Sequence, residues 1–138
     1  MLTLRLGDRT AYGLAAGAGI AGWLVITAAT DRREAWDSEW YFGLFLPLIS
    51  MLVAWLGFLA PRGAWRWAFV PFAGQALAAF ALNPGGRLVP VGLIVFTVFA
   101  IVCLVPALVG AAFRRWLDRT TAPRPKGGIG SRETDPWP

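Results

Sequence analysis

The stretch LVPVGLIVFTVFAIVCLVPALVGAAFRR, residues 88–115, holds 26 residues without a charge before its two arginines. A helix of that length rises about 39 Å, more than a hydrocarbon core of about 30 Å. A soluble amphipathic helix would carry charges along one face, whereas this run is apolar on every side. It predicts a tilted transmembrane helix over 88–113, with Pro90 in its first turn and a kink at Pro106.

Three further apolar runs precede it, at 10–29, 40–60 and 64–82. The second carries Pro47, where a bend is expected. The third is the weakest, since it reaches residue 64 only when Arg66 extends its guanidinium to the headgroups. The first also fits a cleaved signal peptide, but its length exceeds the usual signal core of about 7–15 residues, so we expect it to be retained.

Composition agrees with a membrane protein. The 138 residues are 57% hydrophobic and 15% charged, against about 45–50% and about 25% in soluble domains. We therefore predict an all-α fold: a bundle of four transmembrane helices over 1–119, followed by a Pro- and Gly-rich disordered tail over 120–138. Asn, Pro and Gly at 83–87 predict a tight turn that makes the last two helices an antiparallel hairpin.

The basic residues predict the orientation. With four spans, ten Arg and Lys lie on the side that holds both termini and the loop near 61–66, and three lie on the other side. Cytoplasmic segments carry the excess of basic residues, so both ends are expected in the cytoplasm. Twelve of the 13 basic residues are arginine, a bias typical of GC-rich bacterial genomes, so we expect a multi-pass protein of the bacterial inner membrane.

Several chemistries lack the residues they need. The chain has no His and one Cys, which excludes an internal disulfide and His-based acid–base or metal chemistry. The uncharged cores of the runs hold no ionisable group of the kind that proton-coupled transport uses. We expect no enzyme activity, cofactor or metal. The positive charge favours anionic lipid headgroups as partner, and not nucleic acid.

Small residues mark a helix-packing surface on the first run. Gly13 and Gly17 form a GxxxG pair, and Ala18 and Gly22 repeat the spacing. Such faces let helices approach closely in lipid. Two interpretations stay open, packing within the bundle and an interface with another chain. Gln75, near the middle of the third run, is expected to hydrogen-bond to a neighbouring helix, and a pore or ligand contact is the alternative.

Arginine and tryptophan alternate at one side of the predicted bundle. Such residues anchor a protein in the headgroup region, each Arg contributing about 1 kcal/mol. A specific site for a lipid or a soluble partner is the second interpretation. The predicted lipid-interface residues are Arg62, Trp65, Arg66, Trp67, Arg114, Arg115 and Trp116.

The loop on the opposite side is rich in carboxylates. Asp37 or Ser38 is expected to cap the second helix, with Glu39 favourable at its positive end. The alternative is a partner contact through Trp36, Asp37 and Glu39.

These features favour a non-catalytic accessory or scaffold subunit that packs against another membrane component. The alternative is a homo-oligomeric channel or permease for a small solute, with Gln75 and Ser50 facing the pore. A third class, a membrane enzyme, would use the loop carboxylates Asp37 and Glu39.

Overall fold

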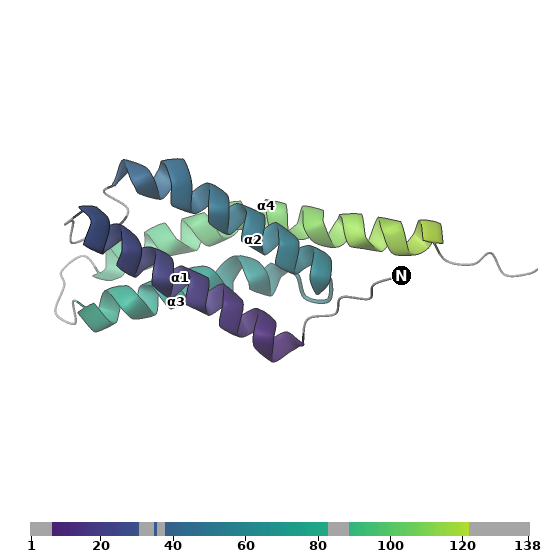
Figure 1. Cartoon of the computed structure of the whole chain (residues 1–138), viewed down its shortest axis with the longest axis horizontal. Helices are drawn as coiled ribbons and strands as arrows, with labels where there is room; N and C mark the ends of the chain where they lie inside the picture. The colour runs from purple at the N-terminus through teal and green to yellow at the C-terminus, as the bar shows by residue number, and fades with distance from the viewer. Residues whose placement is uncertain (1–6, 31–34, 36–37, 83–88, 122–138) are drawn as a thin grey trace, which may run out of the picture.

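The structure is a computed structural model that describes residues 7–30, 35, 38–82 and 89–121. Within these ranges it is all-helical and contains no strand. The elements are α1 (Asp8–Thr30), the π-helical turn η2 (Tyr41–Phe45), α2 (Leu46–Leu59), α3 (Trp65–Leu82) and α4 (Val89–Thr121) (Figure 1). These elements correspond to the four apolar runs.

Three helical segments of the described chain are long and apolar enough to cross a membrane: α1, η2 with α2, and residues 90–121 of α4. The helix α3 does not reach that standard, because Arg66, Pro71 and Gln75 lower its apolar character. It is nevertheless well covered, since it packs along both α1 and α4. Neighbouring helices therefore bury Pro71 and Gln75, whereas Arg66 near the start of the helix stays half-exposed.

The last helix differs from its prediction. It ends at Thr121, well beyond Phe113, and projects past the other helices in Figure 1. Pro106 lies inside it, and the kink expected there stays a prediction. Arg114 and its neighbours are therefore helical. Of the predicted disordered tail, Thr120 and Thr121 belong to this helix, and residues 122–138 lie outside the described residues, as does the turn predicted at 83–87.

Most of the packing occurs within two helix pairs, α1 with α3 and α2 with α4. Tyr12 and Trp67, each near the start of its helix, have ring centroids 5.0 Å apart. Ser50 lies 3.7 Å from Cys103 in the middle of the other pair, and Phe58 meets Phe113 further along. The two helices of each pair therefore run in the same direction and cross each other (Figure 1).

Glycines let the backbones touch where α1 crosses α3. A Cβ on Gly19 would overlap the carbonyl oxygen of Pro71, and a Cβ on Gly74 would lie 2.6 Å from the carbonyl oxygen of Ala16. The contact is reciprocal, because each glycine faces the residue three positions before the other glycine. Any side chain at these positions would push the helices apart.

The crossing of α2 and α4 repeats this arrangement. A Cβ on Gly57 would overlap the carbonyl oxygen of Ala107, and a Cβ on Gly110 would overlap that of Ala54. Again each glycine faces the residue three positions before its counterpart. The bundle thus consists of two crossed pairs, which α3 and α4 join by packing on each other.

The small residues of α1 that the sequence predicted for packing divide into two groups. Gly22 lies against the ring of Phe45, and Ala18 packs partly buried against the core. Gly13 and Gly17 are exposed, and a Cβ on either would meet no described atom within 4 Å. The interpretation of packing within the bundle therefore does not hold for the GxxxG pair, because the buried face of α1 is a different one. That face consists of Ala11, Ala15, Gly19, Trp23 and Ile26.

The crossings give a test with a matched control. Gly110→Ala is expected to destabilise the fold by about 1–3 kcal/mol, because the new methyl group overlaps the backbone of α2, which cannot move freely. Gly17→Ala adds the same methyl group in open space. Because alanine has a better helix propensity than glycine, this substitution should be neutral or stabilise the fold by up to about 1 kcal/mol. Unfolding in mixed micelles, followed by far-UV circular dichroism, measures both. Equal effects of the two substitutions would contradict the reciprocal contact.

Candidate functional site

A polar pair lies in the middle of the bundle. The Tyr41 hydroxyl donates a hydrogen bond of 2.8 Å to Oε1 of Gln75, and both side chains are fully buried. Gln75 therefore makes the hydrogen bond to another helical segment that its sequence position leads us to expect. Its Nε2 has no hydrogen-bond acceptor among the described residues.

The π-helical turn η2 positions Tyr41. The backbone N–H of Leu46 donates to the carbonyl of Tyr41, five residues back. Pro47 follows directly, and a proline ring lacks an N–H and collides with the carbonyl four residues before it in a regular helix. The wide turn is the form the chain takes ahead of this proline. The rings of Phe45 and Phe99 lie 5.3 and 5.5 Å from that of Tyr41 and hold it in the core.

Hydroxyl groups within the spans bond to their own helices. Ser50 donates to the carbonyl of Leu46 at 2.8 Å, and Thr97 donates to that of Leu93 at 2.7 Å. Cys103 is fully buried beside Ser50, as expected of a small filler. No group of His, Cys, Asp and Glu side chains that could hold a metal occurs among the described residues. The hydroxyl groups of Ser50 and Thr97 are therefore satisfied by backbone carbonyls of their own helices.

A groove runs between α1 and α2, the two consecutive helices that contact each other least. Two open cavities lie between these helices, of about 410 and about 270 Å³, and Leu52 lines both. We call them the large and the small section. The large section is lined on α1 by Ala18, Ala21, Gly22, Val25, Ile26, Ala29 and Thr30, and on the other side by Trp40, Leu44, Phe45, Leu48, Ile49 and Leu52. The small section is lined by Leu14, Met51, Leu52, Trp55, Leu56 and Leu59.

The two walls of the groove differ in character. The α1 wall of the large section is mostly Ala and Gly, whereas large exposed side chains such as Leu48 and Trp55 stand on the α2 wall. The only hydroxyl of the lining is that of Thr30, and it donates to the carbonyl of Ile26 at 2.7 Å. The groove is therefore apolar along its length and suits an apolar occupant.

One end of the bundle collects the arginines. We call it the arginine end; it comprises the start of α1, residues 60–64 between α2 and α3, and the end of α4 (Figure 1). Here the Arg66 guanidinium donates to the carbonyls of Gly63 and Arg62 at 3.2 and 2.9 Å. It also lies over the rings of Tyr12 and Trp67, at 5.6 and 5.4 Å from their centroids.

The tryptophans of this end have different surroundings. Trp65 is exposed, in keeping with a place at the lipid interface. Trp67 is fully buried, and its Nε1 donates to the carbonyl of Ala60 at 3.0 Å. The prediction that Trp67 faces the headgroups is therefore corrected: its indole ties the α2–α3 connection to the bundle.

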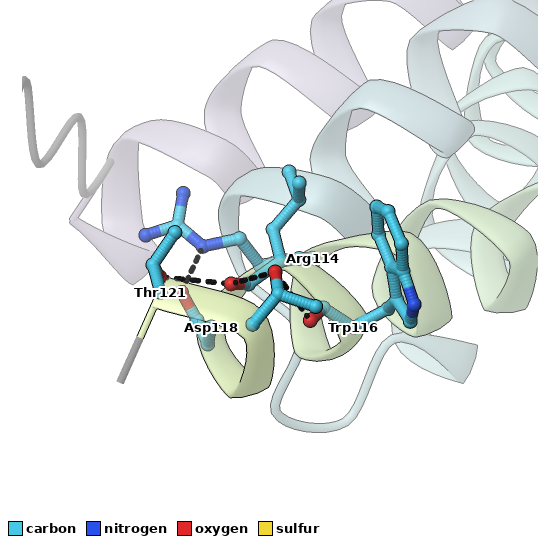
Figure 2. A network of polar contacts seen from close by, with 6 residues as sticks. Arg114, Trp116, Asp118 and Thr121 are labelled. Carbon is cyan, nitrogen blue, oxygen red and sulfur yellow. Dashed lines mark hydrogen bonds and ion pairs between the residues drawn. The ribbon is translucent and has the colours of Figure 1, made fainter. Parts of the chain in front are cut away.

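The end of α4 carries the remaining predicted interface residues. Arg114 bonds to Asp118 one turn further on, at 3.2 Å (Figure 2). Its guanidinium also lies 5.4 Å from the ring centroid of Phe58. Trp116 projects from another side of the helix and is exposed, as is Arg115. The exposed pair suits the headgroup region, whereas Arg114 is partly engaged within the chain.

At the opposite end of the bundle, Ser38 acts as the predicted cap. Its Oγ accepts a hydrogen bond of 3.2 Å from the backbone N–H of Trp40. Glu39 is exposed, while Trp36 and Asp37 lie outside the described residues. The partner contact predicted for Trp36, Asp37 and Glu39 therefore stays a prediction.

The buried pair is expected to be structural, and a double-mutant cycle tests this. Tyr41→Phe strands the Gln75 amide, and Gln75→Leu strands the Tyr41 hydroxyl, so each should cost about 1–3 kcal/mol. The double variant should cost less than the sum of the two, with a coupling energy of about 0.6–1.7 kcal/mol. The free energy of unfolding in mixed micelles gives all four corners, and additive effects would contradict the hydrogen bond.

Comparison with known proteins gives no match: no family model, no curated protein and no solved structure is similar to this chain. Function is therefore inferred from the groove, the buried pair and the arginine end.

Proposed function

We propose that this chain is a non-catalytic integral membrane protein, an accessory or scaffold subunit that binds a transmembrane helix of another membrane protein in the large section of the α1–α2 groove. The groove itself carries the proposal, because an open apolar channel beside a wall of small residues fits an added helix.

The proposed topology has four spans with both ends in the cytoplasm. The helix α3 serves as the third span, since its packing against α1 and α4 buries Pro71 and Gln75, and Arg66 lies near its end, where a guanidinium can reach the headgroups. The excess of basic residues then faces the cytoplasm. The arginine bias of the sequence favours the inner membrane of a bacterium.

The α1 wall favours a helix as occupant. In lipid, apolar faces gain little from meeting each other, so helices associate where small residues let their backbones approach. Ala18, Ala21 and Gly22 provide such a surface within the groove. Gly13 and Gly17 are exposed outside the lining of the groove, and their interpretation as an interface with another chain stays a separate prediction.

The alternative channel has less support. It needs Gln75 and Ser50 to face a pore between copies of the chain, but Gln75 is fully buried within one copy and Ser50 bonds to its own helix. A membrane enzyme would rest on Glu39 and Asp37, and Glu39 is an exposed residue without a described hydrogen-bond partner. No specific observation favours either of these competing functions.

Photo-crosslinking from two positions tests the proposal. Val25 lines the large section and Ile94 lies on α4 away from it, and both side chains are 65% exposed. A benzophenone amino acid at position 25, in cells of the native host, should crosslink a different membrane protein that the same group at position 94 does not capture. Ala21→Trp fills the groove and should lower the partner recovered with the chain in mild detergent about tenfold, the effect of about 1.4 kcal/mol.

Other outcomes decide against the subunit. Equal crosslinks from the two positions would show that the groove is not the interface. Recovery of the chain alone as a defined homo-oligomer would favour the channel, and solute flux in liposomes would then test that function.

A further inference from the structure

The four helices form a ring with one weak side. The glycine crossings hold α1 against α3 and α2 against α4, and α3 packs along α4. Between α1 and α2 lies the large section, and these two helices have few contacts with each other. Two crossed pairs that are joined through α3 and α4 can part on the opposite side without breaking either crossing. The seam between α1 and α2 is therefore where the bundle can widen.

The π-helical turn η2 closes this seam. It holds two buried aromatic residues, Tyr41 and Phe45, whose rings lie 5.3 Å apart. The ring of Phe45 lies against Gly22 of α1 and lines the large section. The Tyr41 hydroxyl donates its hydrogen bond to Gln75 of α3. Both contacts run from the segment that leads into α2 to the other crossed pair. Since one short turn makes both of them, a change in this turn would release them together.

A change of register would release the turn. A π-helical turn contains one residue more than the α-helical turn in its place, and one residue corresponds to about 100° of rotation in an α-helix. Conversion of η2 to an α-helix would therefore rotate both aromatic rings away from their contacts. Pro47 opposes this conversion, because in a regular helix its ring collides with the carbonyl of Gly43. The proline thus keeps the turn in the form that closes the seam.

We propose that η2 is a strap that regulates the width of the large section. With the hydrogen bond between Tyr41 and Gln75 in place, the groove has the width seen in the structure. With this bond broken, α1 and α2 move apart and the large section becomes wider. The movement belongs to the chain alone. Only its consequence, that a partner helix enters the wider groove more readily, rests on the proposed function.

Distances between spin labels across the seam test the strap. Val25 and Leu48 line opposite walls of the large section, and both side chains are exposed. Labels are attached through Val25→Cys and Leu48→Cys in a Cys103→Ala background, and the full chain is measured in lipid nanodiscs by double electron–electron resonance. Tyr41→Phe should increase the population of a second, longer distance about threefold to fifteenfold, the range that corresponds to a hydrogen bond between membrane helices.

Two controls separate the strap from a general loosening of the bundle. Ser50→Ala also removes one hydroxyl group, but this hydroxyl bonds to its own helix, so the distance across the seam should not change. Leu24 of α1 and Leu77 of α3 are exposed and belong to the same crossed pair. The distance between labels at these two positions should be unaltered by Tyr41→Phe.

Pro47→Ala gives a second test that leaves the Tyr41 side chain unchanged. Without the proline ring η2 can become α-helical, so the longer distance between positions 25 and 48 should appear here as well. The same distances across the seam with and without Tyr41→Phe would overturn the proposal, as would equal lengthening between positions 24 and 77. If Tyr41→Phe does not fold, Pro47→Ala decides, and an unchanged distance in that variant would rule the strap out. Because no partner is present, failure of the crosslinking experiment would not affect this result.

Discussion

The reciprocal contact between glycine and backbone carbonyl at each helix crossing is the constraint on which the rest of the structure depends. Gly19 with Gly74, and Gly57 with Gly110, bring two pairs of backbones into touch. Helices that meet so closely at one point diverge on either side of it, so α1 leans on α3 and α2 leans on α4. The space between α1 and α2 is what this geometry leaves open, and the groove follows from the crossings.

The positions of the helices followed from the sequence, but their packing faces did not. A run of 20 uncharged residues has few alternatives to a spanning helix, whatever surrounds it. Lipid, however, makes the outer face of a helix as apolar as the inner one, so nothing in α1 separates Gly17 from Gly19 by polarity. The spacing of small residues did carry a signal, because three of the four segments that touch share the pattern Ala-x-x-Gly, with Pro71 in place of alanine in the fourth. The three are Ala16 with Gly19, Ala54 with Gly57, and Ala107 with Gly110.

Part of the candidate site could be predicted from the sequence, and part could not. Gln75 stands out because an amide in an apolar run needs a partner. Its partner Tyr41 could not be foreseen, because the side chain reaches Gln75 through a π-helical turn that Pro47 imposes and through the packing of a distant helix. Trp65 and Trp67 look alike in sequence, yet the rotation of α3 buries one and exposes the other.

The groove has different consequences in a membrane than it would in water. In water, exposed Leu48 and Trp55 would by themselves drive association, whereas in a bilayer acyl chains already cover them. An occupant that displaces bulk lipid must offer something that lipid chains do not. The small residues on the α1 wall of the large section allow close backbone packing, which a helix provides and an acyl chain does not. The small section has a single α1 residue, Leu14, in its lining, and therefore offers an added helix less of this close packing.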